Sequence, residues 1–235
     1  HGKLLYGRSN KPATKLAHNQ ISVPYGKRFT VELDDGTVVS LNAGSKLDYP
    51  QSFTGMDTRE VYLFGEAYFN VEEDKSRPFI VRTDKMNVRV FGTKFNISNY
   101  SNDSIASAVL TEGSIGVYRP SEIFAEKDLI VMEPGQEVLV QKDSFIVRKV
   151  NIEKHVAWSS DKLHFENDRL ADIIKELERH YNVSIDNKSS ELDDTRYTGT
   201  FSKESIIEVL NIFQSTTHFE YKMENNRITI EKGSN

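Results

Sequence analysis

Residues 33–50 read LDDGTVVSLNAGSKLDYP, and residues 59–71 read REVYLFGEAYFNV. Phe29, Val31 and Leu33 alternate with polar residues before Asp35 and Gly36, and Thr37, Val39 and Leu41 continue the alternation after them. Glycine tolerates the positive φ that a tight hairpin turn requires. The second stretch is apolar on consecutive positions at VYLF, which is typical of a strand covered on both faces. The sequence therefore predicts a β-hairpin followed by a longer, buried strand.

Further short apolar runs follow the first two, separated by turn residues such as glycine, proline, asparagine and aspartate. These runs cover residues 79–82, 86–97, 105–110, 114–118, 129–132, 137–140 and 144–150. No helical periodicity is evident before residue 167. The spacing predicts an all-β domain over residues 22–150, which could be a sandwich, a barrel or a short β-solenoid. Gly65 and Gly92 each separate two strands, and we expect them to serve backbone geometry rather than a binding loop.

After Val150 the pattern becomes that of a small α+β domain over residues 151–235. KLHFE at 162–166 predicts a strand, and Asn167 or Asp168 is predicted to cap the helix that follows. That helix carries one apolar stripe, formed by Leu170, Ile173, Ile174, Leu177 and Tyr181.

Ser202 is predicted to cap a second helix, in which Ile206, Ile207, Val209, Leu210 and Phe213 lie on one side. FEYKM at 219–223 and RITIE at 227–231 predict a hairpin over Asn225 and Asn226. The order of strands and helices predicts two helices packed on one sheet. The chain is therefore expected to be mainly β, with the α+β domain at its end.

Residues 1–21 carry Lys3, Arg8, Lys11 and Lys15 without an acid, and they lack sustained periodicity. We interpret them as a solvated linker, with contact to anionic lipid headgroups as the alternative. The whole chain has a net charge of −5 at pH 7, and both predicted domains are acidic. A nucleic-acid-binding protein usually has a basic face, so the charge argues against a nucleic-acid partner.

The residue patterns that support chemistry are missing from the sequence. Cysteine is absent, no histidine pair has the spacing of a zinc site, and neither a phosphate-binding glycine loop nor a G-x-S-x-G turn occurs. The adjacent acids Asp34–Asp35 and Asp193–Asp194 are expected to be solvated turn residues, since acid–base catalysis needs carboxyl groups opposed across a substrate. The sequence predicts no catalytic residue, no cofactor and no metal.

The strongest candidate for a partner-binding surface is the strand predicted within TRYTGTF at 195–201. An uncovered strand edge accepts another protein's strand through main-chain hydrogen bonds, while alternate side chains supply selectivity. Gly199 weakens the side-chain cover of this strand. The residues assigned to the surface are Arg196, Tyr197, Thr198 and Thr200. The alternative is that the strand is internal and fully paired.

An ordered set of short motifs runs along the chain from about residue 22 to its end. The motifs are DDGTVVSLNAGSKLDYP at 34–50, REVYLFGEAYFNV at 59–71, PFIV at 78–81, VFGTKFN at 90–96, LTEGSIGV at 110–117, PGQ at 134–136 and LHFENDRLADIIKELERHY at 163–181. This ordered set resembles the periplasmic part of the FecR family, and its last motif is similar to the C-terminal extension of Bacteroidetes members. Phe91 stands where the family more often has leucine.

The resemblance implies a single-pass inner-membrane anti-sigma factor whose periplasmic part is this chain. The cytoplasmic anti-sigma segment and the transmembrane helix would then lie outside the sequence, so the sigma factor and the membrane are reached only through them. The C-terminal domain is similar to the short domain of secretins and TonB-dependent transducers. The implied partner is the N-terminal signalling domain of a TonB-dependent outer-membrane transporter.

Two other classes of function are weighed against this regulatory role. Ten tyrosines and thirteen phenylalanines in a largely β chain are compatible with a carbohydrate- or surface-binding module. A hydrolase is the least favoured alternative, because the spacing of a catalytic site is missing.

Overall fold

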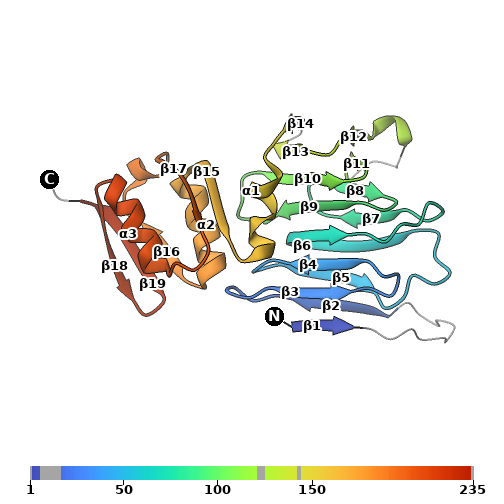
Figure 1. Cartoon of the computed structure of the whole chain (residues 1–235), viewed down its shortest axis with the longest axis horizontal. Coiled ribbons are helices and arrows are strands. Elements are labelled where there is room, and N and C mark those ends of the chain that lie inside the picture. Colours follow the sequence, from blue (N-terminus) through green and yellow to red (C-terminus); the bar gives the residue numbers. More distant parts are fainter. Residues whose placement is uncertain (1, 6–16, 121–124, 142–143, 234–235) are drawn as a thin grey trace. The chain divides into compact units, whose positions relative to one another are not determined.

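The computed structural model describes residues 2–5, 17–120, 125–141 and 144–233, which belong to two units, His1–Val156 and Ala157–Asn235 (Figure 1). The first unit is built almost entirely of strands. They are β1 (Gly2–Leu5), β2 (His18–Ser22), β3 (Phe29–Glu32), β4 (Val38–Leu41), β5 (Lys46–Pro50), β6 (Arg59–Asn70), β7 (Phe79–Arg82), β8 (Asn87–Val90), β9 (Lys94–Asn99), β10 (Ala106–Glu112), β11 (Ile115–Tyr118), β12 (Ile130–Met132), β13 (Gln136–Gln141) and β14 (Ser144–Lys149).

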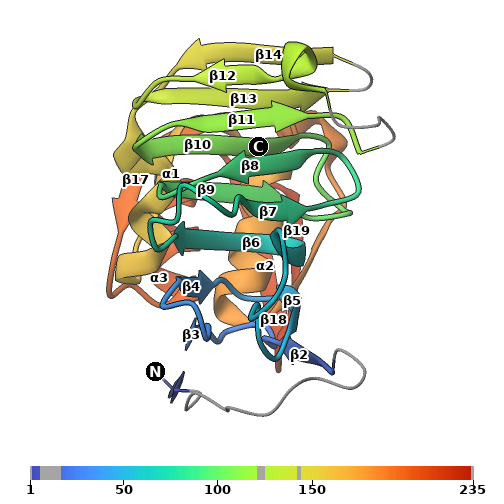
Figure 2. The ribbon, with the colours of Figure 1, turned by 90° about the vertical axis from the view of Figure 1, so that its right-hand side faces the viewer.

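The strands of the first unit form two layers that share β6 (Figure 2). One layer has the order β1-β3-β4-β6-β9-β10-β13-β14, and the other has the order β2-β5-β6-β7-β8-β11-β12. The predicted all-β region is confirmed. Its described strands form one 14-stranded sheet that is continuous through β6 and nearly barrel-like. The predicted hairpin is also present, since β3 and β4 pair antiparallel around Gly36, which has a φ of 92°.

β6 passes from one layer to the other at Gly65. Its first half pairs with β5 and β7, and from Gly65 onward it pairs with β4 and β9. Gly65 has a φ of 91°, and a Cβ added there would lie 2.6 Å from Ser45 Oγ. Both observations require glycine, because L side chains rarely adopt this φ and no space is available. The prediction that Gly65 serves backbone geometry is confirmed.

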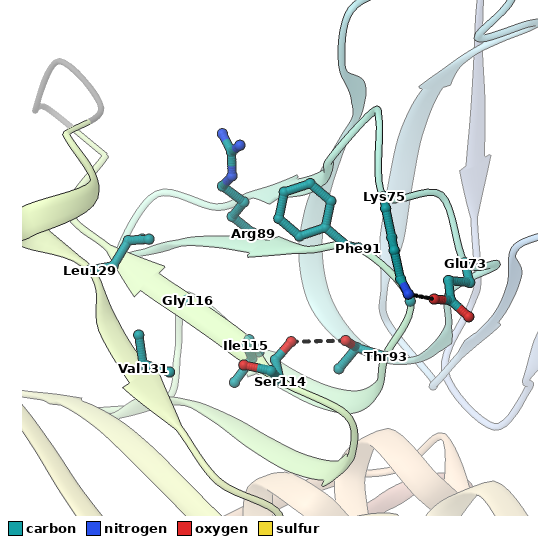
Figure 3. A pocket seen from close by; sticks show the side chains of 11 residues that line it. Glu73, Lys75, Arg89, Phe91, Thr93, Ser114, Ile115, Gly116, Leu129 and Val131 are labelled. Carbon is teal, nitrogen blue, oxygen red and sulfur yellow. Dashed lines mark hydrogen bonds and ion pairs between the residues drawn. The ribbon is translucent and has the colours of Figure 1, made fainter.

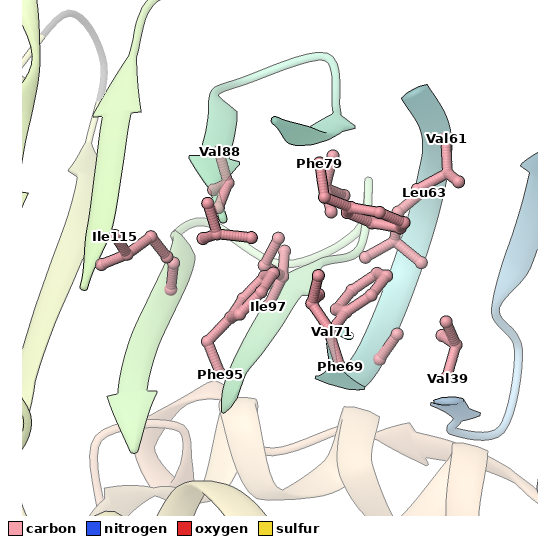
Figure 4. Packing of buried hydrophobic residues seen from close by; sticks show 14 of the residues in the cluster. Val39, Val61, Leu63, Phe69, Val71, Phe79, Val88, Phe95, Ile97 and Ile115 are labelled. Atoms are coloured by element: carbon pink, nitrogen blue, oxygen red, sulfur yellow. The ribbon is translucent and has the colours of Figure 1, made fainter. Parts of the chain in front are cut away.

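The core lies between the two layers, and both contribute aromatic side chains to it (Figure 4). Phe69 stacks on Phe95 within one layer at a centroid distance of 5.0 Å. Phe69 also contacts Phe79 of the opposite layer at 6.2 Å, in a tilted arrangement. Since all three rings are fully buried, each contributes roughly 1.5–3 kcal/mol by leaving water. The alternation in β6 therefore fixes which face of the strand enters the core.

Three expectations for the first unit need correction. β6 is not covered on both faces, since Tyr62 and Phe64 on its outer face are 50% and 39% exposed. Part of the predicted linker forms strands, because β1 pairs with β3 and β2 with β5 through main-chain hydrogen bonds that need no apolar periodicity. Residues 6–16 of that linker lie outside the described residues. Helical segments also precede residue 167: the 3₁₀ turn Glu126–Asp128, helix α1 (Ile152–Val156) and the 3₁₀ turn Ala157–Ser160. They are too short to produce a periodic pattern.

The second unit contains the predicted order of elements. These are β15 (Leu163–Arg169), α2 (Leu170–Tyr181), β16 (Ser184–Asn187), the 3₁₀ turn Ser190–Leu192, β17 (Arg196–Phe201), α3 (Ile206–Thr216), β18 (Phe219–Glu224) and β19 (Arg227–Lys232). The strands divide into two sheets, β15-β17 and β16-β19-β18, whereas the sequence predicted one. The order of elements does not determine strand pairing, which depends on contacts between distant segments. The closing hairpin is confirmed, with Asn225 in the left-handed region at a φ of 56°.

Both predicted helix caps are wrong by a few residues. α2 starts after Arg169, because Asn167 and Asp168 remain in β15, where Asp168 Oδ2 accepts a hydrogen bond from Glu166 N at 2.8 Å. α3 is capped by Ser205, whose side chain and that of Glu208 form a reciprocal capping box. Several neighbouring polar residues can cap a helix, so the sequence alone did not show which of them does so.

The apolar stripes of the two helices follow the expected spacing closely. Leu170, Ile173, Ile174 and Leu177 of α2 are buried, and Tyr181 packs against the same core while remaining half-exposed. In α3 the predicted stripe is buried with one exception, since Ile207 is 46% exposed.

Candidate functional site

β17 places the predicted partner-binding residues on opposite faces. Arg196, Thr198 and Thr200 are exposed, while Tyr197 points inward and is 7% exposed. The Tyr197 ring stacks on Phe213 of α3 at a centroid distance of 4.2 Å. Burial raises the pKa of the Tyr197 phenol. The structure therefore brings three of the four residues to the surface and assigns Tyr197 to the core of the unit.

The exposed side chains of β17 are held by hydrogen bonds to β15. Arg196 Nη1 donates to Asn167 O at 2.6 Å, and Thr198 Oγ1 accepts from Asn167 N at 2.9 Å. Thr200 Oγ1 lies 2.9 Å from His164 Nδ1. The register of β15 and β17 shifts between Phe165 and Asp168, which forms a bulge at Asn167. Side chains of β17, rather than regular main-chain hydrogen bonds, connect this bulge to β17. The result is a preorganised polar face on a two-stranded ribbon.

β17 is an edge strand. In the part of the chain that the structure describes, it pairs only with β15. The alternative that this strand is internal and paired on both sides does not hold for these residues. One side of β17 therefore presents main-chain donors and acceptors that another strand can use.

The motifs that were most prominent in the sequence hold the first unit together. The carboxylate of Glu66 accepts hydrogen bonds from Asn42 Nδ2 at 2.7 Å and from Asn96 Nδ2 at 2.9 Å. Ser45 Oγ donates to Glu66 O and accepts from Glu66 N, at 2.9 and 2.8 Å. Residues from three separate motifs thus form one polar network. Their chemistry is used for structure, as expected for buried polar groups.

A groove of about 310 Å³ opens on the first unit beside β8 and β11 (Figure 3). Its lining includes the exposed side chains of Phe91 and Val131, and Gly116 on its floor lies close to Leu129. The guanidinium of Arg89 lies 5.3 Å from the centroid of the Phe91 ring. The sequence alone did not predict this groove. The one feature of the sequence that pointed to this part of the surface was Phe91, at a position where the FecR family more often has leucine.

Several polar groups in the lining of the groove pair with one another. Glu73 is the one carboxylate in its lining, and it forms an ion pair with Lys75 at 3.2 Å. Thr93 Oγ1 donates to Ser114 O at 2.8 Å. Hydrolysis of the two-carboxylate type needs a second opposed acid, which this lining does not supply.

The described ranges contain neither a cluster of metal-binding side chains nor a helix that could span a membrane. Across residues 2–5, 17–120, 125–141 and 144–233, no group of three or more His, Cys, Asp or Glu side chains is placed to hold a metal ion. In the same ranges, no helix has both the length and the apolar character needed to cross a bilayer.

Comparison with protein families matches two regions of the chain, in order. The family described as FecR protein matches residues 19–116, and the family described as FecR, C-terminal, matches residues 162–230. The chain belongs to the FecR family. The FecR match covers most of the first unit, and the C-terminal match covers most of the second unit, including β17.

Solved structures similar to this FecR-family chain come from Parabacteroides distasonis ATCC 8503. Two crystal structures of a protein assigned there as an anti-sigma factor share 33% sequence identity with this chain at a TM-score of 0.83. They cover 92% and 93% of this chain, and 100% of the solved chain in each case. Among curated proteins, none matched this FecR-family chain. The similarities support a regulatory, non-catalytic region of an anti-sigma regulator.

Proposed function

We propose that this chain is the periplasmic signal-receiving region of a transmembrane anti-sigma factor. It would relay the occupancy of a TonB-dependent outer-membrane transporter to an extracytoplasmic-function sigma factor, by protein–protein interaction and without catalysis. The observation that carries the proposal is the ordered match of both FecR regions over both units.

In this proposal the chain acts by binding the N-terminal signalling domain of the transporter. Binding biases the receiving region between two arrangements only to the extent that the signalling domain has different affinities for them. The change then passes to a transmembrane helix and a cytoplasmic segment outside these 235 residues, and only that segment contacts the sigma factor. The chain itself is anchored to the inner membrane through that helix and binds no nucleic acid.

The unpaired edge of β17 supports a specific docking mode. An extended strand of the signalling domain would pair with this edge through main-chain hydrogen bonds. Arg196, Thr198 and Thr200 flank that edge from the exposed face, and Tyr197 supports it from the core. Arg196 supplies a positive charge, which favours an acidic residue on the incoming strand.

The function is tested by isothermal titration of the chain with the cognate signalling domain. We expect binding, and we expect Arg196→Glu to weaken it at least tenfold. Lys222→Glu is the matched control, because Lys222 is an exposed cation on β18, an edge strand of the other sheet, and we expect less than a twofold change. Failure of the wild-type chain to bind at several hundred micromolar contradicts the receiver function. Binding that Arg196→Glu leaves unchanged contradicts only the assignment of the surface.

A second candidate function is favoured by one observation on β6. Tyr62 and Phe64 are 50% and 39% exposed, and their positions two residues apart place them on the same face of the strand. Exposed aromatic rings on a sheet are suited to stacking against sugars, as in a carbohydrate- or surface-binding module. A glycan array separates the two functions: robust hits that are lost in Tyr62→Ala favour the module.

A further inference from the structure

The two layers of the first unit end at the same end of it, in β14 and β12 (Figures 1 and 2). Within the described residues, β14 pairs only with β13, and β12 pairs only with β11. Each of these edges therefore has main-chain groups on one side that are not used by a neighbouring strand.

The sequence of β14, SFIVRK, does not protect this edge. Ile146 and Val147 at its centre are 46% and 40% exposed, and the strand contains neither proline nor glycine. Its cations, Arg148 and Lys149, occupy only the last two positions. Val131 of β12 is 66% exposed at the same end. Soluble proteins usually protect edges with central charges, proline or bulges, so an aliphatic edge indicates a surface that another strand covers.

The two faces of β14 differ in what an added strand would contact. Phe145 and Val147 lie opposite Val140 and Val138, which belong to the core between the layers. Ile146 lies opposite Leu139, on the outer face of the same sheet. An added strand with apolar residues at matching positions would extend the core on one face and cover Ile146 on the other.

We propose that β14 is a homodimer interface, in which a second copy of this chain supplies the added strand. The two β14 strands would pair antiparallel around a two-fold axis normal to the sheet at Ile146. This axis leaves the core-facing sides of both copies on the same face of the joined sheet. A residue that lies a given number of positions after Ile146 then faces the partner residue that lies the same number of positions before Ile146. Ile146 then faces the partner's Ile146, Phe145 faces the partner's Val147, and Ser144 faces the partner's Arg148.

Charge selects this register over its neighbour. With the axis at Ile146, each Arg148 faces a hydroxyl side chain and keeps its ion pair with Glu137, at 2.8 Å. With the axis at Val147, Arg148 would face the partner's Ile146 and Lys149 would face the partner's Phe145, which desolvates both cations against apolar groups.

A second copy fits this edge because the strand is complementary to itself. In the register at Ile146, apolar side chains face apolar side chains across the whole centre of the strand. A closed two-fold dimer also covers the exposed edge of both copies at once, whereas a different partner would need a matching sequence of its own. The interface lies on the first unit and is independent of the signalling-domain surface proposed on β17.

Disulfide trapping tests the register, because the chain contains no cysteine. In Ile146→Cys the two Cβ atoms would lie roughly 4.5–5.5 Å apart, close enough for a disulfide after small adjustments. Ser144→Cys is the matched control on the same exposed strand. Its two copies would be four positions apart, roughly 14 Å, which is too far to bridge. We expect rapid oxidation of Ile146→Cys to a covalent dimer and at least tenfold slower oxidation of Ser144→Cys.

Sedimentation equilibrium of the unmodified chain tests the dimer itself. We expect a monomer–dimer equilibrium that Ile146→Lys weakens at least tenfold. At concentrations where both proteins are monomeric, the melting temperature should be unchanged, because the site is exposed. A wild-type chain that stays monomeric up to about 1 mM overturns the proposal. Equal oxidation rates of the two cysteine variants overturn the proposal as well. So does a chain that binds a different protein at β14 but does not associate with itself.

Discussion

Replacing Arg59 by methionine should destabilise the first unit by about 5 kcal/mol, because this side chain is a buried cation with four protein hydrogen bonds. Arg59 starts β6 and is 1% exposed. Its Nη1 donates to Asp35 Oδ2 at 2.8 Å and to Glu72 O at 2.9 Å. Its Nε and Nη2 donate to Arg77 O at 3.2 and 3.0 Å. The guanidinium also lies 5.5 Å from the centroid of the Phe79 ring.

The magnitude follows from what the substitution leaves behind. The Asp35 side chain, 5% exposed, would lose its counter-ion, and breaking a buried pair by removing one partner costs about 3–5 kcal/mol. The carbonyl groups of Glu72 and Arg77 would lose their donor, and each unsatisfied buried acceptor adds about 1–3 kcal/mol. Asp35→Asn should lose less stability than Arg59→Met, because Arg59 would still donate hydrogen bonds to the carbonyl groups of Glu72 and Arg77. The double variant should cost less than the sum of the two single variants, with a coupling of about 0.5–3 kcal/mol.

Urea unfolding followed by far-UV circular dichroism measures these differences on the whole chain. Arg82→Met is the matched control, since Arg82 forms a two-bond pair with Glu60 at 2.7 and 3.1 Å, with side chains 32% and 30% exposed. An exposed pair of this kind contributes about 0–1 kcal/mol. If Arg59→Met loses no more stability than Arg82→Met, or if the single and double variants are additive, the buried-pair reasoning is refuted.

Three further predictions concern single positions. Gly65→Ala should cost at least about 2 kcal/mol, through its φ of 91° and a clash with Ser45, just before β5. Gly55→Ala, with a φ of 79° and open space around it, should lose only the conformational part of that stability, and urea midpoints compare the two variants. Ser205→Ala should cost about 1 kcal/mol in the same assay through loss of the capping box, and a similar loss in Ser202→Ala would contradict the cap assignment. Burial raises the pKa of Tyr181 to about 12, from an ordinary value of 10. Folding therefore favours the neutral phenol of Tyr181. The contribution of Tyr181 to the free energy of unfolding is fully present below pH 10 and is lost as the pH rises through 12. Tyrosinate absorbance should show a late step that the phenylalanine variant at this position lacks, and an unchanged titration would disprove it.

The candidate partner-binding site was only partly predictable from sequence. The pattern at 195–201 located a strand correctly, and the structure shows that it lies at an edge. It could not show that Tyr197 turns inward onto Phe213, because alternation states only that neighbouring residues point to opposite faces. The groove at Phe91 escaped prediction for a similar reason, since its walls come from segments far apart in the chain.

The sequence by itself determined the mainly β character, the hairpin turns at Gly36 and Asn225, and the apolar stripes of α2 and α3. These features depend on residues within a few positions of one another, so local periodicity and turn chemistry are sufficient. The tertiary structure alone decided that β6 is shared between two layers, that the second unit has two sheets, and that β14 and β17 lie at edges. Strand pairing joins segments that are distant in sequence, and the free energy of each pairing depends on every other pairing in the sheet. For that reason the surfaces on which the function is proposed became visible only in the folded chain.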